Sequence, residues 1–380
     1  MKTLSSLETP ALVLDRVALD RNLARMSSRM SELGVGLRPH VKTAKSLDVI
    51  RRALVSPAQG ITVSTLKEAD YFFEAGVSDI LYAVGIAPGK IAHVLSLIAR
   101  GAQLKIAADN IEAVRAVAAA AAARDVIVPM VIELDVDGHR SGVRPDSDLL
   151  LELGREFKVH RHLRLRGVMT HAGDSYNCAN TDAIGDMAER ERAGSVLAAE
   201  RLRAMDHLLD IVSVGSTPTA RFARALDGVT EVRVGVYMFQ DLVMWNLGVC
   251  QLTDIAIATL VTVIGHQAER GWLITDGGWM ALSHDRGTAR QAVVQGYGLV
   301  RDIRGLPTEE DLLVVSANQE HGILARRDGM PVDPARYPVG TMLRVLPNHA
   351  CAMAAQHAEY QVVRGSSIEI LESWPRINGW

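Results

Sequence analysis

Cysteine is scarce in this sequence: Cys178, Cys250 and Cys351 are the only three in 380 residues. Thiols so few and so scattered exclude the disulfide framework that stabilises small secreted domains. The N-terminal segment MKTLSSLETPALVLD also lacks the sustained apolar stretch of a secretory signal peptide. We therefore expect a cytoplasmic protein.

The sequence also lacks long apolar runs and any excess of positive charge. Its longest apolar runs, such as residues 254–265, contain threonine and are shorter than the roughly 20 residues that a membrane-spanning helix needs. The formal net charge of −3 gives no broad basic surface for nucleic acid or anionic lipid. We expect neither a membrane nor a nucleic-acid partner, and small-molecule chemistry instead.

What the sequence does contain is an alternation of strands and helices. Eight short apolar or β-branched runs occur at residues 36–43, 61–65, 79–84, 104–108, 127–136, 165–171, 211–215 and 232–238. Stretches with helical periodicity lie between them, for example 16–33, 111–124 and 182–209. Eight such units predict an α/β fold, a closed (β/α)8 TIM barrel. A doubly wound sheet is the competing topology, but no glycine-rich dinucleotide fingerprint follows the first strand.

The last third of the chain has a different pattern. From about residue 251, β-branched runs separated by turn residues replace the long helical patterns, at 255–263, 272–276, 312–316 and 341–346. We predict a barrel over residues 10–250 and a mostly β domain over 251–380. Residues 10–15 form a further predicted strand, which either joins the β domain or leads into the barrel.

The first barrel strand ends in a cluster of cations. Chemistry in such barrels lies at the C-terminal ends of the strands, and alternation along LRPHVK would point Arg38, His40 and Lys42 into the barrel. A desolvated lysine amine is what imine chemistry requires. An exposed lysine beside a loop is the simpler interpretation of Lys42 taken alone. Lys45 is the rival, but we expect it to begin the next helix and face solvent.

Two later strand ends carry candidate cofactor contacts. DGHRSGV places Arg140 in a glycine-flanked turn, where its guanidinium could bind a ring oxygen or a carboxylate. THAGDSY places His171 where an imidazole could stack on a flat cofactor. A surface arginine and a hydrogen-bonded core histidine are the alternatives.

The seventh and eighth strands end in GSTPT and GVYMFQD. Glycine, serine and threonine at these two ends match the place where such barrels hold a phosphate through N–H groups and hydroxyls. Either loop alone would be an ordinary turn.

The β-rich segment adds His349 and Cys351, two residues apart. On an extended segment their side chains would project the same way, and imidazole with thiolate suits Zn²⁺. Two protein ligands would leave the open positions that a catalytic metal needs. As an isolated pattern, H-x-C also arises by chance.

Many motifs together resemble the D-threonine aldolase / D-serine dehydratase family of fold-type III pyridoxal-5′-phosphate (PLP) enzymes, which have an alanine-racemase-like barrel. They are TPALVLD, LRPHVKTAKS, GITVSTLKEA, DILYAV, DGHRSGV, THAGDSY, VSVGSTPT, EVRVGVYMFQD, DGGWMALSHDRGTA, NQEHGIL and LPNHAC. The resemblance implies that Lys42 is the Schiff-base lysine and that His349 and Cys351 hold a divalent metal, for which Zn²⁺, Mn²⁺ and Mg²⁺ all fit. The implied PLP contacts are His40, Arg140, His171, Ser216, Thr217, Gly235 and Tyr237.

The resemblance also implies an activity. Aldolases of the family have H-x-D-P where this chain has H-x-C, as dehydratases do. We therefore expect a homodimeric dehydratase of a β-hydroxy D-amino acid such as D-threo-3-hydroxyaspartate or D-serine, with retro-aldol cleavage as the alternative. A PLP carrier without catalysis and a metal-dependent barrel hydrolase without PLP are further alternatives. Candidates for binding a second substrate carboxylate are Arg286, His284 and His321.

Overall fold

The computed structural model describes residues 2–55 and 60–380, which divide into two compact units. One comprises Arg25–Gly235 with Gly379–Trp380, and the other the segment up to Ala24 with Val236–Asn378. The division falls inside helix α1 (Arg16–Glu32) and just after the last barrel strand. Residues 236–250, which the sequence analysis placed in the barrel, therefore group with the β-rich unit.

The first unit is an eight-stranded parallel barrel, as the sequence predicted. The strand order is β2-β9-β8-β7-β6-β5-β4-β3, and an isolated parallel bridge between His40 and Thr62 joins the two end strands. The strands are β2 (Gly36–Pro39), β3 (Ile61–Val63), β4 (Asp79–Gly85), β5 (Gln103–Ala108), β6 (Val128–Leu134), β7 (Leu163–Thr170), β8 (Ile211–Val214) and β9 (Glu231–Val234).

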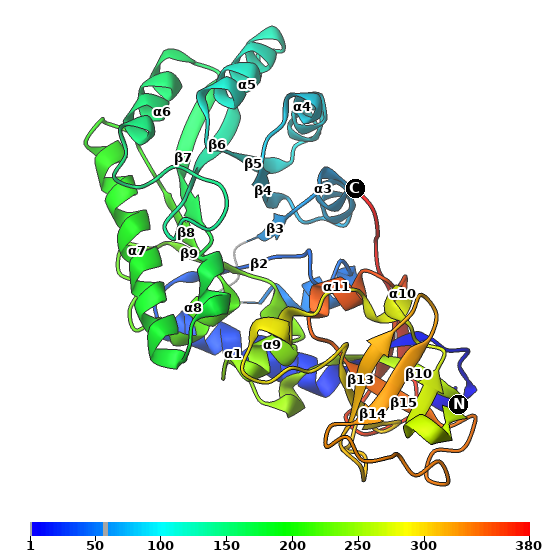
Figure 1. Ribbon diagram of the computed structural model, residues 1–380. Coiled ribbons are helices and arrows are strands. Elements are labelled where there is room, and N and C mark those ends of the chain that lie inside the picture. Colours follow the sequence, from blue (N-terminus) through cyan, green and yellow to red (C-terminus); the bar gives the residue numbers. More distant parts are fainter. Residues whose placement is uncertain (1, 56–59) are drawn as a thin grey trace. The chain divides into compact units, whose positions relative to one another are not determined.

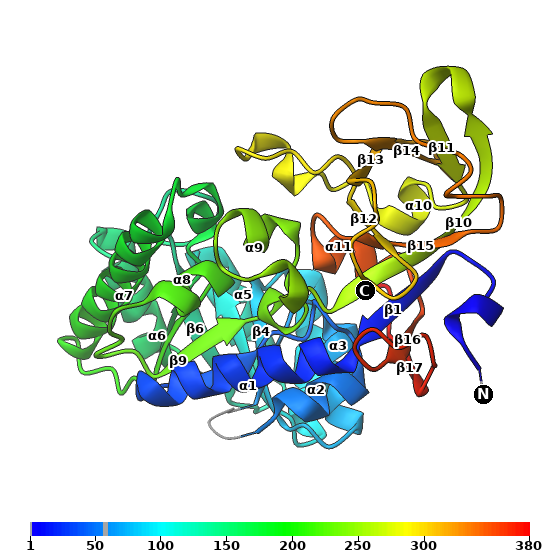
Figure 2. The ribbon, with the colours of Figure 1, turned by 90° about the horizontal axis from the view of Figure 1, so that it is seen from below.

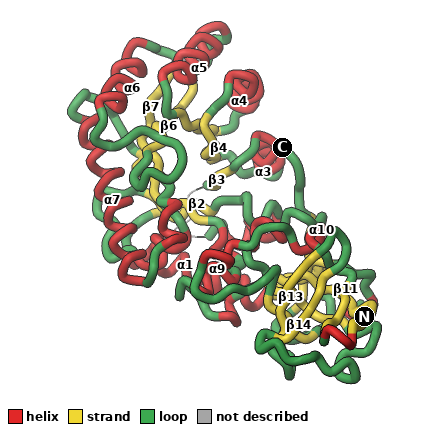
Figure 3. Tube along the Cα trace, in the orientation of Figure 1, coloured by secondary structure: helices red, strands yellow, loops and turns green. Residues whose placement is uncertain are grey.

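Helices lie outside these strands (Figures 1 and 3). They are α2 (Leu47–Ala53), α3 (Leu66–Glu74), α4 (Ile91–Ala99), α5 (Ile111–Ala123), α6 (Asp148–Val159), α7 (Thr181–Arg203) and α8 (Thr217–Phe222), with 3-10 turns η2 (Pro88–Lys90) and η3 (Gly173–Asn177). Polar caps begin the helices at defined residues: the side chains of Asn110 and Asn180 accept hydrogen bonds from the first turns of α5 and α7.

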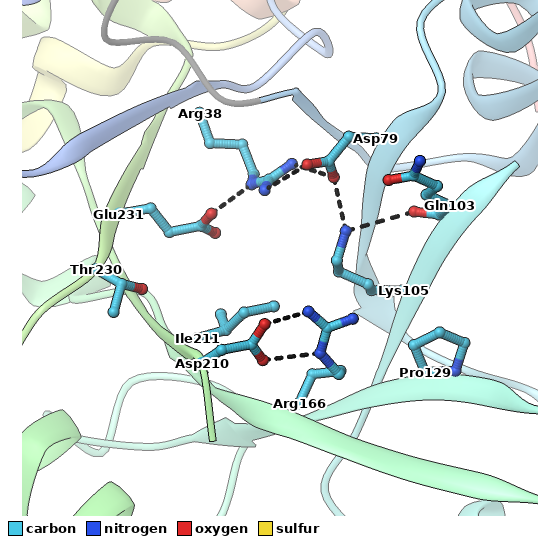
Figure 4. A pocket seen from close by; sticks show the side chains of 10 residues that line it. All are labelled: Arg38, Asp79, Gln103, Lys105, Pro129, Arg166, Asp210, Ile211, Thr230 and Glu231. Atoms are coloured by element: carbon cyan, nitrogen blue, oxygen red, sulfur yellow. Dashed lines mark hydrogen bonds and ion pairs between the residues drawn. The ribbon is translucent and has the colours of Figure 1, made fainter. Parts of the chain in front are cut away.

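The N-terminal ends of the barrel strands surround a charged cavity of about 410 Å³ (Figure 4). The Nε of Arg38 lies 2.7 Å from a carboxylate oxygen of Glu231, and its Nη1 lies 2.9 Å from Asp79. Asp79 also accepts a 2.7 Å hydrogen bond from Lys105. Arg38 thus points into the barrel as predicted, but its charge is already paired at the mouth opposite the strand ends where chemistry is expected. We interpret this cluster as structural.

The second unit is built on a nine-stranded sheet in the order β11-β14-β13-β12-β15-β10-β1-β16-β17. A further β11–β10 pairing closes six of the strands into an antiparallel barrel. The strands are β1 (Ala11–Asp15), β10 (Ile257–Gln267), β11 (Trp272–Thr275), β12 (Leu299–Asp302), β13 (Leu312–Ala317), β14 (Gly322–Arg326), β15 (Met342–Leu346), β16 (Glu359–Val363) and β17 (Glu372–Pro375).

Strand β1 is the predicted N-terminal strand, for which the sequence left two positions open. It pairs antiparallel with β10 and parallel with β16 (Figure 2), so it joins the β-rich unit. Short helices α9 (Leu242–Asn246), α10 (Trp279–Leu282) and α11 (Ala350–Ala354) complete this unit, with 3-10 turns η1 (Leu4–Ser6), η4 (Val236–Met238), η5 (Leu252–Asp254), η6 (Ala268–Arg270) and η7 (Gly287–Arg290). In the described part of the chain, no helix combines the length and apolar character needed to cross a bilayer.

Candidate functional site

Lys42 lies in the turn that follows β2, and its side chain is exposed. Its exposure contradicts the expectation of a desolvated amine, but its charge lies close enough to lower the pKa of the buried rings of His40 and His171. The ladder ends with His40, and the main chain then turns so that the N–H of Lys45 donates to Val41 O at 2.7 Å. Strand alternation therefore stops before it reaches Lys42.

Lys45 was expected to face solvent, and that expectation was also wrong. Its side chain is only 16% exposed, and Nζ lies 3.3 Å from Oε1 of Glu68, which is fully buried. Burial and the ion pair hold the Lys45 amine against Glu68, so it is not free to react with a cofactor. Within the described residues no carboxylate pairs with Lys42 in this way, so Lys42 remains the better candidate for the imine.

His40 and His171 lie in the barrel near the same group of cations. Burial, with smaller contributions from the positive charges of Lys42 and Arg140, lowers the pKa of His171 to about 3, although the hydrogen bond from its ring to Gly215 O opposes the shift. Burial also brings the pKa of His40 well below its usual value, with Lys42 again contributing. Both imidazoles are therefore neutral near neutral pH. His171 Nδ1 lies 2.8 Å from Gly215 O, so Nδ1 carries the hydrogen; its stacking on a cofactor stays a prediction.

Arg233 on β9 is an interior cation that the sequence analysis missed. Its Nε donates to Ser213 Oγ at 2.8 Å, and Nη2 donates to Thr170 O. Ser213 Oγ in turn donates to Glu231. Strand alternation in EVRV could have revealed Arg233, because Glu231 and Arg233 share the inward face of β9.

In the loop after β8, the main chain passes very close to the main chain of β9. Gly215 has φ of +145°, and a Cβ there would lie 2.2 Å from Arg233 O, so only glycine fits. The next residue, Ser216, caps α8, and its hydroxyl also bonds Ser175 Oγ at 2.8 Å.

Glu191 on α7 holds this loop and the loop after β7 together. It is 1% exposed, and its Oε1 accepts 3.0 Å hydrogen bonds from the N–H groups of Ala172 and Gly215. Its Oε2 accepts from Thr219 Oγ1 at 2.7 Å. The sequence pattern did not indicate this residue, because a glutamate within a charged helical pattern usually faces solvent.

Three features match the predicted phosphate contacts. Thr217 Oγ1 is buried without a hydrogen-bond partner among the described residues, and the same holds for Tyr237 Oη in the β-rich unit. Such orphaned hydroxyls are rare in proteins and point to a missing acceptor. At Gly235 a Cβ would lie 2.7 Å from Thr43 Oγ1 and 3.1 Å from His40 O. Within the barrel unit, the orphaned hydroxyl of Thr217 fits a phosphate acceptor, so its chemistry agrees with PLP, while the contact of Tyr237 with the same phosphate stays a prediction.

Arg140 lies in the turn between Gly138 and Gly142, both with positive φ, as predicted. Its guanidinium is 57% exposed and 3.5 Å from the buried carboxylate of Glu133 on β6. Its contact with a cofactor stays a prediction.

His349 and Cys351 do not lie on an extended segment as expected, because α11 starts at Ala350 with His349 as its N-cap. Their side chains are nevertheless hydrogen-bonded to each other. Burial opposes the charged imidazole, but Cys351 and a 2.6 Å contact with Asp285 outweigh it and raise the pKa of His349 well above its usual value.

This donor set fits a divalent metal. Imidazole and thiol are the ligands that Zn²⁺ prefers, and no cluster of three or more metal-ligating side chains occurs among the described residues. Two protein ligands would leave positions open on the ion, as a catalytic metal needs.

The three candidates for a second substrate carboxylate all lie in the β-rich unit. The His284 ring stacks on Trp279 at 4.2 Å, and the Arg286 guanidinium lies 5.0 Å from the centre of the Tyr297 ring. His321 is exposed in the turn before β14. Their roles stay predictions.

Comparisons with known proteins match two consecutive parts of the chain. The alanine racemase N-terminal domain matches residues 14–242, and the putative serine dehydratase domain matches residues 256–363. The chain belongs to the alanine racemase N-terminal domain family. One relative of this chain, D-threo-3-hydroxyaspartate dehydratase from Delftia sp. (strain HT23), is 52% identical over 381 residues, covering 100% of this chain and 99% of the relative.

Other relatives are similar to this chain over nearly its whole length. D-serine dehydratase from Dictyostelium discoideum is 30% identical over 397 residues, covering 99% of this chain and 98% of the relative. A solved structure of D-threo-3-hydroxyaspartate dehydratase, a cysteine-to-alanine variant in a metal-free form, is 51% identical with a TM-score of 0.97 and covers 100% of both chains. The resemblance drawn from the motifs is thereby confirmed.

Proposed function

We propose that this protein is a PLP- and divalent-metal-dependent dehydratase of β-hydroxy D-amino acids. The preferred substrate is D-threo-3-hydroxyaspartate, which would give oxaloacetate and ammonia; D-serine would give pyruvate and ammonia. The observation that carries the proposal is the 52% identity to D-threo-3-hydroxyaspartate dehydratase over the whole of both chains. The adjacent His349 and Cys351 side chains support the metal.

Several residues of the barrel and of the segment after it are the proposed PLP-binding residues. Lys42 would hold PLP covalently, and Ser216, Thr217, Gly235 and Tyr237 would bind its phosphate. When bound, PLP supplies an electron sink for negative charge that develops at the substrate Cα.

The amine of Lys42, neutral when it acts, takes the α-proton. His40 and His171 do not compete as bases, because their depressed pKa values make them poor proton acceptors.

His349 and Cys351 would hold the metal, which supplies Lewis-acid chemistry to the substrate's β-hydroxyl so that it can leave as water. Loss of the α-proton and the hydroxyl forms a carbon–carbon double bond. Tautomerisation and hydrolysis of that product release the 2-oxo acid and ammonia.

Product analysis tests the reaction. The purified protein is incubated separately with D-threo-3-hydroxyaspartate, D-serine and D-threonine, and ammonia, 2-oxo acids, glycine and aldehydes are quantified. Ammonia with an equimolar 2-oxo acid is the expected result. Glycine with an aldehyde would replace the proposal by retro-aldol cleavage, and a colourless protein without PLP would favour the metal-dependent hydrolase.

Lys42→Ala tests the lysine assignment. We expect the visible absorbance of lysine-bound PLP to disappear while the fold is retained, because Lys42 is exposed and carries no structural ion pair among the described residues. Lys45→Ala is the matched control, and it should keep that absorbance while losing stability, since it leaves buried Glu68 unpaired. The opposite pattern would transfer the role to Lys45.

The expected homodimer is also part of the proposal, since the resemblance implies it. Sedimentation of the purified protein measures the mass directly, and a monomer that is fully active would contradict it. The cytoplasmic location stays a prediction.

A further inference from the structure

Asp285 contacts His349 although the two residues are 64 positions apart in the sequence. Oδ2 of Asp285 lies 2.6 Å from Nδ1 of His349. An ionised carboxylate can only accept, so Nδ1 carries the hydrogen and Nε2 is the nitrogen left for a ligand bond.

The loop before Asp285 holds this carboxylate in a defined place. Ser283 has φ of +74°, a backbone conformation that is strained for any residue other than glycine. The hydroxyl of Ser283 accepts a 2.9 Å hydrogen bond from the N–H of Asp285. The N–H of Ser283 donates to Trp279 O at 2.8 Å. Strain of this kind persists where the surrounding contacts fix it, often at functional sites.

The main chain around His349 is fixed by other groups. Asp241, 1% exposed, accepts a 3.0 Å hydrogen bond from the N–H of Ala350. The side chain of Asn348 accepts from Thr288 Oγ1 at 2.6 Å. The imidazole is 42% exposed, and the side chains of both Cys351 and Asp285 bond to it. Asp285 does so at Nδ1 and therefore restrains the rotation of the ring.

We propose that Asp285 is a positioning residue for the metal: it orients His349 so that Nε2 and the Cys351 thiolate converge on one divalent cation. This inference rests on the metal of the proposed function. Metal-binding histidines commonly donate their second N–H to a carboxylate, and loss of that partner weakens metal binding about 10–100-fold.

Metal affinity tests the proposal independently of turnover. Zn²⁺ dissociation constants are measured by competition with a chromophoric chelator for the PLP-loaded wild type, Asp285→Ala and Asp285→Asn. We expect Zn²⁺ binding to weaken about 10–100-fold in the alanine variant and by less in the asparagine variant, whose amide oxygen can still accept. Glu269→Ala removes an exposed carboxylate from the same unit and should bind like wild type.

Two spectra separate positioning from unfolding. The PLP absorbance should be unchanged in every variant, and the thiolate-to-metal band of the Co²⁺-loaded protein should weaken in Asp285→Ala while the melting temperature without metal stays the same. If that melting temperature falls, the Zn²⁺ affinity of the nearly isosteric Asp285→Asn variant is compared with that of the wild type instead. Weaker binding in this variant supports the positioning role, and equal binding contradicts it.

Each outcome bears on one of the two proposals. Wild-type Zn²⁺ affinity in Asp285→Ala would overturn the role of Asp285 and leave the proposed function standing. A wild-type protein that binds neither Zn²⁺ nor Co²⁺ would overturn the metal half of the proposed function and this inference with it.

Discussion

Glu191 presents a buried carboxylate to two loops of the barrel, and its replacement tests how those loops are held. It accepts hydrogen bonds from the N–H groups of Ala172 and Gly215 and from the hydroxyl of Thr219. Glu191→Ala removes the two carboxylate oxygens that accept these three hydrogen bonds. Glu191→Gln keeps an oxygen for both N–H groups and can donate from its amide to the hydroxyl.

The cost of the alanine variant follows from the orphaned donors. Each buried N–H group left unsatisfied costs about 1–3 kcal/mol, so the two together predict a loss of roughly 2–6 kcal/mol. The hydroxyl of Thr219 adds little because it can donate to Ser216 O instead. The glutamine variant should lose less than about 1.5 kcal/mol, since its hydrogen bonds are retained.

The pH dependence gives a second, sharper prediction. Burial raises the pKa of Glu191, although the hydrogen bonds from Thr219 and the two N–H groups oppose the shift. A raised pKa in the folded state means that the stability from this group is complete below its unfolded pKa of about 4.3 and is lost as the pH rises through the folded value. The wild type should therefore lose stability with rising pH relative to Glu191→Gln, which has no such proton to lose.

Thermal unfolding over a series of buffers from acid to neutral measures both effects. We expect a midpoint several degrees lower for Glu191→Ala at every pH, and a gap between glutamine variant and wild type that grows with pH. Equal midpoints for the alanine and glutamine variants would refute the assignment of the two N–H groups to Glu191. A pH-independent gap would refute the raised pKa.

Two further substitutions test the charged mouth and the orphaned hydroxyl. Arg38→Ala should lower the free energy of unfolding by about 3–5 kcal/mol, because it removes the ion-pair partner of buried Glu231. Thermal unfolding measures this loss. The double variant Arg38→Met with Glu231→Leu should recover most of the lost stability. Thr217→Val should leave the PLP-free protein as stable as wild type and weaken PLP binding roughly tenfold or more, since a hydrogen bond to a charged group contributes about 1.5–3 kcal/mol. Fluorescence titration with PLP measures the affinity of the Thr217→Val variant, and an unchanged affinity would mean that the phosphate does not contact Thr217. Ser216→Ala, which removes a helix cap, should lower the stability instead.

The barrel strands were predictable because their signal is local. A buried parallel strand is a short apolar run between turn residues, and the run 127–136 became β6 (Val128–Leu134). The predicted strand 36–43 was too long, because the chain turns after His40, where apolar and polar residues still alternate. The β-rich unit was predicted less completely. Strand β17 (Glu372–Pro375) has the sequence ESWP, and its pairing with β16 is a tertiary contact with no local pattern.

The candidate ligand-binding residues were predictable for a related reason: their position at a strand end is itself a sequence feature. The error at Lys42 came from the turn of the main chain after His40, and the error at Lys45 came from a tertiary contact that the sequence does not show. Lys45 lies in the segment before α2 and pairs with Glu68 on α3, and no sequence pattern indicates this pair.

Glu191 and Asp285 show why the residues that hold a site are harder to find than those that line it. Glu191 lies between Arg190 and Arg192 in a helix, and the periodicity of that helix does not separate one buried carboxylate from its exposed neighbours. Asp285 acts through His349 only because a strained turn brings it there. Both act on a neighbour through hydrogen bonds, so their loss should change affinity for PLP or metal before it changes the chemistry of a fully loaded enzyme.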